Sequence, residues 1–372
     1  MIANVSTEEF RDALGKILSV IDRKNSRPIL TLNLLIAKNR QLELIATDLE
    51  VSVKIIISAN VENDGVFCVN TKNIFDIIRE FPDNSIQLES NIEEKVLKIS
   101  GNNIQYSLLI NSSNDFPVIN FENSKNGFTV NTDQLSEIIN RTSHAISIDE
   151  TRPALTGLFI QEIDSKLRAV ATDGCRLSLI EAEITETNND SLINGIIIPR
   201  KGVFELKKIT DSFRNETINI SIDDSFLYTN VLNKYFISIR LIARDFPKYQ
   251  TLIPSKTAHG LIVDKISLLN AIKRVKIMSN EKINGVILKF WNNEMVISAN
   301  HPLYGKASEK VSVEYNGEET EIGFNAKYLM ETITTYEDGD ISVEFNNKLT
   351  PFLVRSASLP HFLSIVMPLK IQ

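Results

Sequence analysis

The stretch LELIATD at residues 42–48 recurs as LRAVATDG at 167–174 and as EMVISANH at 294–301. Each is an apolar run that leads through an alanine into a polar turn, the pattern of a strand that ends at a turn. The three stretches lie about a third of the 372-residue chain apart. This regular spacing predicts one structural unit written three times.

Two kinds of helix accompany these strands in the same order in each copy. Ser6 and Glu9 form a capping box, and apolar residues follow at helical spacing over 10–21, as they do again over 135–146 and 268–275. A second helix follows an apolar strand in VFCVNTKNIFDIIREF from Val66, IIIPRKGVFELKKI from Ile196 and IGFNAKYLMETI from Ile322.

The segments between the helices are largely alternating and β-branched, as in VSVKIIIS at 51–58 and INISID at 218–223. Their short connections favour antiparallel pairing, so we expect an α+β fold. The Phe-Pro stretches at 116–119 and 246–254 close the first two copies. We therefore place three similar domains at 1–122, 123–253 and 254–372, since a chain of this length exceeds what one core supports.

Composition excludes several classes of protein. The net charge of −7 argues against a protein that coats nucleic acid through a global positive field. The N-terminus has no basic segment followed by an apolar one, and no run of eighteen apolar residues occurs, so we expect a cytoplasmic protein with no membrane partner. Cys68 and Cys175 lack a CxxC partner and are expected to be free thiols.

Motifs for catalysis, cofactors and metals are missing. The chain has no GxGxxG, no P-loop and no HExxH, so we expect no cofactor and no enzyme activity. Its four histidines, His144, His259, His301 and His361, lack metal-ligand spacing. Asp48 and Asp173 occupy equivalent ATD positions and could form a carboxylate pair of a hydrolase, but we favour turn formation. On this alignment the third copy has Asn300 instead of aspartate.

Charge is unevenly divided along the chain. Basic residues gather in the helical segments, for example Arg200, Lys201, Lys207 and Lys208, whereas acidic residues concentrate in 181–190 and 309–321. Two interpretations remain open at this point: the helices meet phosphates on a common surface, or lysine and arginine simply solvate the helices. Aromatic residues do not interleave with these cations, which argues against stacking on single strands.

Five stretches resemble the family of bacterial DNA polymerase processivity clamps, the beta sliding clamps. They are DETRPALTG at 149–157, AVATDGCRL at 169–177, IIPRKGVFEL at 197–206, MSNEK at 278–282 and VMPLK at 366–370. The resemblance covers the whole chain in the correct order. It implies three domains of the clamp fold, each with antiparallel sheets outside and two helices inside, and a head-to-tail dimeric ring around duplex DNA. It also implies a processivity factor without catalysis that tethers DNA polymerase III alpha, other polymerases and the clamp loader.

The resemblance also assigns residues. Partners of the family insert a hydrophobic peptide between the second and third domains, where aliphatic and methionine side chains accept apolar anchors. The matching positions are Leu155, Thr172, Gly174, Cys175, Arg176, Leu177, Pro247, Pro351, Val366, Met367, Pro368 and Leu369. The implied DNA-facing residues are Lys24, Lys72, Arg200 and Lys201. The implied dimer contacts are Tyr106, on an edge strand, and Ile277 and Met278, at a helix end.

The chain departs from the family pattern at two places. Cys175 stands where a histidine or another polar residue is common, and the ending MPLKIQ replaces a shorter one. A protein-interaction scaffold that never binds DNA is the alternative function, because the cleft alone would suffice for it.

Overall fold

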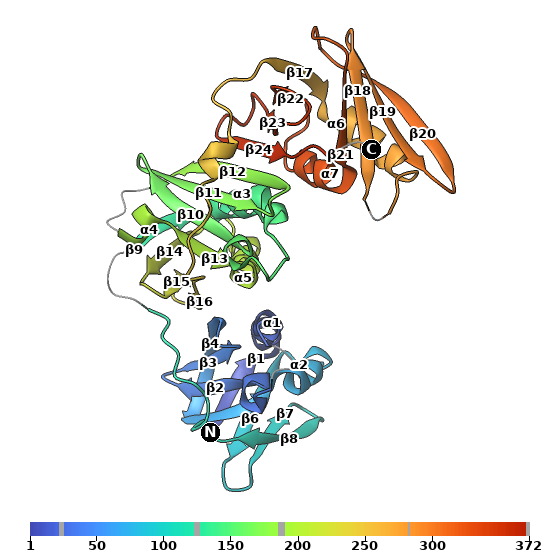
Figure 1. Ribbon diagram of the computed structural model, residues 1–372. Coiled ribbons are helices and arrows are strands. Elements are labelled where there is room, and N and C mark those ends of the chain that lie inside the picture. The colour runs from blue at the N-terminus through green and yellow to red at the C-terminus, as the bar shows by residue number, and fades with distance from the viewer. Residues whose placement is uncertain (22–25, 123–126, 185–189, 282, 370–372) are drawn as a thin grey trace. The chain divides into compact units, whose positions relative to one another are not determined.

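The computed structural model describes residues 1–21, 26–122, 127–184, 190–281 and 283–369 (Figure 1). Strands outnumber helices in these ranges, and the strand pairings are antiparallel, as predicted. The first copy contains β1 (Ile2–Ser6), α1 (Thr7–Leu18), β2 (Leu32–Lys38), β3 (Gln41–Thr47), β4 (Val51–Asn63), β5 (Gly65–Asn70), α2 (Thr71–Arg79), β6 (Ser85–Asn91), β7 (Val96–Ser100) and β8 (Gln105–Asn111).

The second and third copies repeat this order. The second contains β9 (Gly127–Asn131), α3 (Thr132–Thr142), β10 (Gly157–Ile163), β11 (Lys166–Thr172), β12 (Arg176–Glu183), α4 (Asp190–Asn194), β13 (Ile196–Pro199), α5 (Arg200–Ser212), β14 (Thr217–Ile222), β15 (Phe226–Val231) and β16 (Tyr235–Arg240). The third contains β17 (His259–Asp264), α6 (Lys265–Lys276), β18 (Gly285–Trp291), β19 (Glu294–His301), β20 (Gly305–Ser312), β21 (Thr320–Asn325), α7 (Ala326–Thr334), β22 (Asp340–Phe345), β23 (Phe352–Arg355) and β24 (Phe362–Val366).

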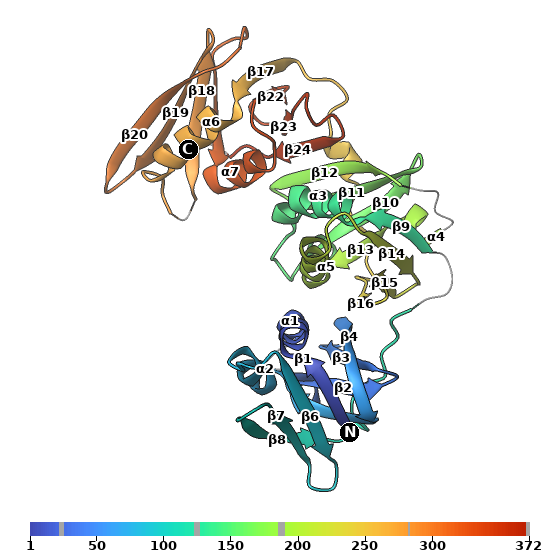
Figure 2. The same ribbon diagram turned by 180° about the vertical axis from the view of Figure 1, so that it is seen from behind.

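The helices form where the sequence places apolar residues at helical spacing. Ser6 caps α1 by accepting from the backbone N–H of Glu9 at 3.4 Å, so half of the predicted capping box is present. Phe10, Leu14 and Ile17 are buried beneath this helix, and burial of such side chains contributes about 1.5–3 kcal/mol each. In both views α1 lies beside α2 and α6 lies beside α7 (Figures 1 and 2).

Three details of the helices differ from the sequence prediction. The helix expected to reach residue 21 ends at Leu18. The helix expected to reach residue 146 ends at Thr142 and continues as a 3₁₀ turn over Ser143–Ala145. The short helix α4 was not predicted, because a segment of five residues has too few positions to display a period.

Each copy contributes two strand ladders with the same internal order. One ladder reads β1-β6-β7-β8, β9-β14-β15-β16 and β17-β22-β23-β24 in the successive copies, and the other reads β5-β2-β3-β4, β13-β10-β11-β12 and β21-β18-β19-β20. Neighbouring copies join edge to edge, because β4 pairs with β16 and β12 pairs with β24.

These joins explain how the chain divides into compact units. One unit contains 1–136, 184–191 and 201–241, and the other contains 137–183, 192–200 and 242–372. The division cuts through the second copy because that copy shares one continuous sheet with each of its neighbours. Each join lies within one unit.

The ladder register corrects the alignment of the third copy. Phe159 in β10 pairs with Val170 and Ile197, and Ile287 in β18 pairs correspondingly with Ser298 and Gly323. Counting on from these pairs, Ala299 matches Ala171, Asn300 matches Thr172 and His301 matches Asp173. The expectation that Asn300 replaces the aspartate was therefore wrong by one position.

Candidate functional site

The junction between β12 and β24 carries most of the residues that the sequence predicted for a cleft. Arg176 lies opposite Val366 and Leu177 lies opposite Ile365 in this ladder. Beyond β24, the N–H of Met367 donates to the carbonyl of Cys175 at 2.8 Å. The N–H of Leu369 then donates to the carbonyl of Gly323 in β21, also at 2.8 Å. The segment 366–369 thus runs alongside the turn that carries Cys175 and ends beside β21.

An apolar cluster underlies this junction. Its buried members are Phe159, Val170, Leu177, Leu179, Ile197, Tyr249, Leu353 and Ile365, and its partly buried members are Ala154, Ile242, Phe246, Ile253, Leu363 and Met367. Phe246 stacks on Phe159 with ring centroids 4.7 Å apart. The partly buried side chains present apolar surface to solvent, which suits the anchors of a hydrophobic peptide.

The predicted cleft residues divide into interior and accessible positions. Leu177 and Val366 are each 1% exposed, and Val366 points into the core of the third copy with Phe352 and Val354. Leu155, Thr172 and Arg176 are also buried. The accessible positions are the exposed Gly174, Cys175 and Pro247 and the half-buried Pro351, Met367, Pro368 and Leu369.

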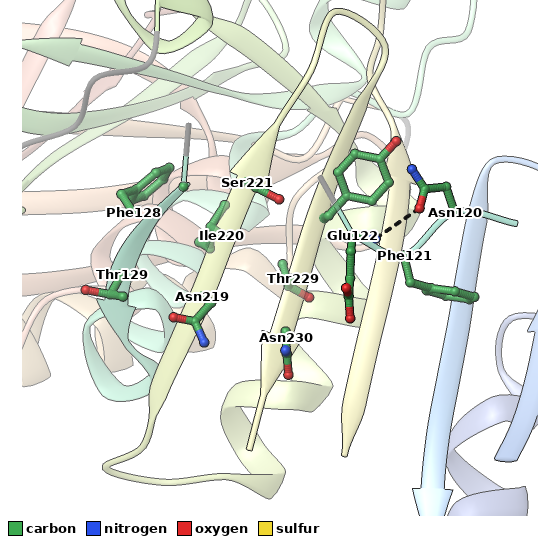
Figure 3. A pocket seen from close by; sticks show the side chains of 12 residues that line it. Asn120, Phe121, Glu122, Phe128, Thr129, Asn219, Ile220, Ser221, Thr229 and Asn230 are labelled. Carbon is green, nitrogen blue, oxygen red and sulfur yellow. Dashed lines mark hydrogen bonds between the residues drawn. The ribbon is translucent and has the colours of Figure 1, made fainter. Parts of the chain in front are cut away.

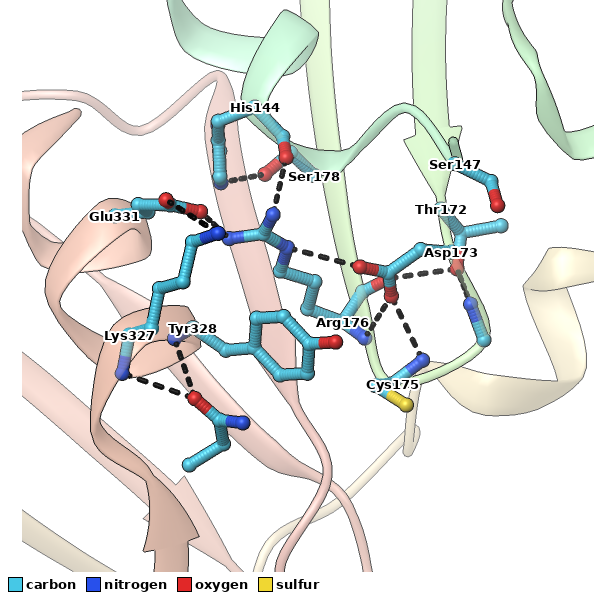
Figure 4. A network of polar contacts seen from close by, with 12 residues as sticks. His144, Ser147, Thr172, Asp173, Cys175, Arg176, Ser178, Lys327, Tyr328 and Glu331 are labelled. Atoms are coloured by element: carbon cyan, nitrogen blue, oxygen red, sulfur yellow. Dashed lines mark hydrogen bonds and ion pairs between the residues drawn. The ribbon is translucent and has the colours of Figure 1, made fainter. Parts of the chain in front are cut away.

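Arg176 has a structural role that the sequence did not reveal (Figure 4). Its side chain is 7% exposed, and the guanidinium contacts Asp173 Oδ2 at 3.2 Å, Glu331 Oε2 at 2.5 Å and the carbonyl of His144 at 2.5 Å. It also lies over the ring of Tyr328, 4.6 Å from its centroid. We call Arg176, Asp173, Tyr328 and Glu331 the Arg176 clasp. The Arg176 side chain thus links the turn of the second copy to helix α7 of the third.

His144 lies behind the clasp. Its Nε2 is 3.3 Å from the hydroxyl of Ser178, which in turn is 3.3 Å from the hydroxyl of Ser364 in β24. Burial, and secondarily the charge of Arg176, lowers the pKa of His144 to about 3. The imidazole is therefore neutral at physiological pH.

The carboxylates of Asp48 and Asp173 each bond the backbone of their own turn. Asp173 Oδ1 accepts from the N–H groups of Cys175 and Arg176 at 2.8 and 3.0 Å, and Asp48 Oδ1 accepts from those of Glu50 and Val51 at 2.9 and 2.7 Å. In the third copy, His301 Nδ1 accepts from the N–H of Leu303 at 3.2 Å. The turn interpretation is confirmed, because all three side chains bond the backbone two residues onward.

The predicted DNA-facing residues have different environments. Lys24 lies outside the described residues. Lys72 is exposed in the first turn of α2. Arg200, the first residue of α5, is half-buried. The ammonium of Lys201 pairs with Asp48 Oδ2 and donates to the carbonyl of Val20 at 2.9 Å, so this lysine ties the first copy to the second.

Carboxylates neutralise several other cations of the helices. Lys208 pairs with Glu205 at 2.6 Å and Lys265 with Asp338 at 3.0 Å, and Arg274 pairs with Glu309. The segregation of charge that the sequence suggested is therefore weaker than a count of basic residues implies.

The predicted dimer contacts lie at the surface. Tyr106 in β8 is 39% exposed and Ile277 after α6 is 78% exposed, whereas Met278 is half-buried. Sequence reasoning missed three exposed apolar side chains: Leu109 in β8, and Leu303 and Tyr304 in the turn before β20. Alternation within β8 could have indicated Leu109, but a hairpin turn gives no such signal.

A hollow of about 740 Å³ lies on the first unit, next to the strands β9, β14 and β15 (Figure 3). Amide and hydroxyl side chains such as Asn219, Asn230 and Thr129 line it, and Glu122 is the one carboxylate among its described lining residues. Within the described ranges, no group of three or more His, Cys, Asp or Glu residues could hold a metal ion. No helix in the same ranges is long and apolar enough to cross a membrane.

Comparison with known proteins identifies the relatives of this chain. Residues 1–120, 129–248 and 250–370 match the N-terminal, central and C-terminal domains of the DNA polymerase III beta subunit. The beta sliding clamp of Caulobacter vibrioides strain NA1000 is 30% identical over 364 residues, covering 96% of this chain and 97% of the relative. That of Pseudomonas aeruginosa is 28% identical over 368 residues, covering 99% of each.

Solved structures agree. The sliding clamp of Bartonella birtlesii bound to griselimycin superimposes with a TM-score of 0.94 at 28% identity, covering 100% of both chains. The clamp of C. crescentus, crystallised with polyethylene glycol bound, gives 0.93 at 29% identity, covering 100% of this chain and 99% of that one.

Three copies joined through their sheets, with an apolar cluster at the second junction, define a DNA sliding clamp of three domains. The chain belongs to the DNA polymerase III beta subunit family, the beta sliding clamps. Members of this family are processivity factors for DNA polymerase rather than enzymes.

Proposed function

We propose that two copies of this chain close head to tail into a ring that encircles duplex DNA and tethers DNA polymerase to it. One observation carries the proposal. The chain makes the same sheet-to-sheet join twice, between β4 and β16 and between β12 and β24. The ladder order makes β20 the third equivalent of β4 and β12, and β8 the third equivalent of β16 and β24. Each of these two strands is left without that partner in the described ladders, so a second chain can supply it.

The intrachain joins predict the register of this third join. The N–H of Met367 donates to the carbonyl of Cys175 at 2.8 Å, and the N–H of Arg240 donates to that of Glu50 at the same distance. By equivalence, the N–H of Leu109 donates to the carbonyl of Tyr304 in the other chain of the dimer. Tyr106 then lies opposite Ala307, and the exposed apolar residues at both edges become covered. This proposal keeps Tyr106 and Ile277 at the interface and adds β20 to the contacts expected from sequence.

Topological linkage to DNA requires only weak phosphate contacts, which suits an acidic chain with scattered cations. We propose Lys72 and Arg200 as DNA-facing residues, together with Lys24. We do not propose Lys201 as a DNA-facing residue, because its ammonium already binds Asp48 and the carbonyl of Val20.

Partners would dock at the cleft of the second junction. We propose that polymerases, including DNA polymerase III alpha, and the clamp loader insert a short apolar peptide against Met367, Leu369 and Pro247. The apolar cluster beneath the junction, which includes the buried Leu177, supports this role. In this proposal the exposed Cys175 lies at the edge of the cleft.

We further propose the cytoplasm as its location and domain boundaries near residues 122 and 253. The gaps between the matched family ranges, after residue 120 and after residue 248, support these boundaries.

Two measurements test the proposed function. Light scattering should give twice the mass of one chain, and protein loaded on circular DNA should be retained longer than on the same DNA linearised. A monomer at micromolar concentration, with equal retention on both, would contradict the ring and favour a scaffold without DNA. For the cleft, Met367→Ala should weaken binding of an apolar peptide by about 1–3 kcal/mol. An unchanged affinity would remove Met367 from the site.

A further inference from the structure

We infer that Arg274 crosses the subunit boundary of the ring and binds the C-terminal end of α2 in the other chain. This contact rests on the proposed ring and adds a charged hydrogen bond to its interface. The first helices of the three copies, α1, α3 and α6, have Lys16, Arg141 and Arg274 as their tenth residues. The same helix position thus carries a cation in every copy.

At the first junction this cation contacts the next copy along the chain. The ammonium of Lys16 is held by Asp12, four residues earlier in α1, at 2.7 Å. It lies 5.2 Å from the ring centroid of Phe213 and 6.0 Å from that of Tyr235. Both rings belong to the second copy, so Lys16 reaches from the first domain to the second.

At the second junction the cation binds a helix end. Arg141 Nε contacts Glu137, four residues earlier in α3, at 3.1 Å. Its Nη1 donates to the carbonyl of Thr335, the C-cap residue of α7, and its Nη2 contacts Glu337 at 3.3 Å. The guanidinium also lies over the ring of Phe362, 5.5 Å from its centroid. A helix end of this kind attracts a cation, because its last carbonyls lack partners within the helix.

The third copy holds its cation at the edge strand that the other chain would join. Ile180 in β12 lies opposite Phe362, and the ladder order makes Glu309 in β20 the equivalent of Ile180. Helix α6 packs against β20. Arg274 Nε contacts Glu309 Oε2 at 2.8 Å, and its Nη2 contacts Oε1 of the same carboxylate. The guanidinium therefore lies at the ladder position where the second junction has its aromatic ring, and its side chain is 61% exposed.

Glu309 takes the place of the carboxylate within the helix. The residue four positions before Arg274 is Asn270, whereas the other two first helices have an acidic residue there. Glu309 engages Nε and Nη2 of Arg274, and in the described ranges Nη1 has no acceptor. Nη1 is also the atom with which Arg141 binds the end of α7. The donor needed for the cross-boundary bond is therefore available.

The end of α2 matches the end of α7 residue for residue. The two helices are of equal length, and the strands that follow them begin at Ser85 and Asp340, equally far from the helix ends. Glu80, the C-cap residue of α2, is thus the equivalent of Thr335. By this equivalence, Nη1 of Arg274 donates to the carbonyl of Glu80 in the other chain.

Fluorescence-detected sedimentation of labelled protein gives the dissociation constant of the dimer. Arg274→Gln should raise this constant about tenfold, because a charged hydrogen bond across the boundary is lost. Glu309→Gln removes the same ion pair within the chain but leaves the guanidinium able to cross. It should therefore raise the constant by less than about threefold.

Lys289→Gln is the charge-matched control, because Lys289 lies in β18, which β19 separates from β20, and pairs with Glu319 at 2.7 Å. It should leave the dissociation constant unchanged. Equal effects of Arg274→Gln and Glu309→Gln would show that only the pair within one chain matters, and would overturn the role of Arg274 while leaving the ring intact. A wild-type protein that stays monomeric at micromolar concentration would instead overturn the ring itself.

A photochemical cross-link locates the contact. The photoreactive residue p-benzoylphenylalanine at position 274 should join two chains on a denaturing gel, and trypsin should then release a cross-linked peptide that contains Glu80. Cross-links confined to a single chain, in a protein that still sediments as a dimer, would place Arg274 away from α2 of the other chain and overturn the inference.

Discussion

Arg176 Nη1 lies 2.5 Å from Glu331 Oε2, so one buried side chain of β12 is bonded to a helix of the third domain. The same guanidinium holds Asp173 in the turn that carries Gly174 and Cys175. Arg176 therefore takes part both in the turn at Gly174 and Cys175 and in the contact between the central and C-terminal domains.

Arg176→Ala should lower the free energy of unfolding of the second unit by about 3 kcal/mol, because two carboxylates lose their cation in a largely buried setting. Arg176→Lys should recover only part of this loss. An ammonium lacks the planar guanidinium that contacts both carboxylates and lies over the ring of Tyr328. Urea unfolding monitored by circular dichroism measures both variants. Arg244→Ala, at an exposed arginine of the same unit, is the control and should change stability by less than about 0.5 kcal/mol. Equal effects of Arg176→Ala and Arg244→Ala would contradict the clasp.

His144 should make the stability of the protein depend on pH. Its pKa is about 3 when folded and 6.5 when unfolded, so below pH 6.5 the unfolded state binds the proton first. Stability is unaffected by this residue above pH 6.5 and falls as the pH drops from 6.5 towards 3, by up to about 1.4 kcal/mol per pH unit. His144→Gln should flatten this part of the profile, as measured by urea unfolding at pH 7, 6, 5 and 4. Parallel profiles for the two proteins would show that His144 does not contribute.

The sequence predicted the threefold repeat, the helix pairs and the strand ends, because these depend on local periodicity and turn chemistry. It placed Gly174, Cys175 and Met367 near a junction through the resemblance. It could not distinguish Leu177 and Val366, which are interior, from Met367, which is accessible, since all three are apolar and only packing separates them. The roles of Arg176 and Lys201 were missed because each depends on a carboxylate far away in the sequence.

The proposed ring register can be tested by cross-linking. Tyr106 and Ala307 should face each other across the subunit boundary as a pair without mutual backbone hydrogen bonds, equivalent to Ser364 and Ser178. Such pairs have Cβ atoms about 4.5–5.5 Å apart, close enough for a disulfide after a small adjustment. In a Cys175→Ser background, Tyr106→Cys with Ala307→Cys should give a covalent dimer on non-reducing gels.

Two controls accompany this cross-link. Ser107→Cys with Ala307→Cys shifts the pair by one residue and places the thiols on opposite faces of the sheet, so it should cross-link poorly. Tyr106→Cys alone should remain monomeric on the gel, because head-to-tail contact brings two different strands together. Efficient cross-linking of the shifted pair would refute the register, and none in either pair would refute the strand join.

Lys201 and Lys327 offer a last comparison, because they occupy the same position in α5 and α7 but differ in environment. Lys201→Met should lower the free energy of unfolding of the first unit by about 1–2 kcal/mol, since Asp48 and the carbonyl of Val20 lose a shared donor. Lys327→Met should change the stability of the second unit by less than about 0.5 kcal/mol, because its ammonium is largely solvated and its ion pair is long. Retention on circular DNA should be the same for Lys201→Met and wild type, which distinguishes a junction tie from a phosphate contact. If instead Lys201→Met shortened retention at unchanged stability, Lys201 would have to be counted among the DNA-facing residues despite its bond to Asp48.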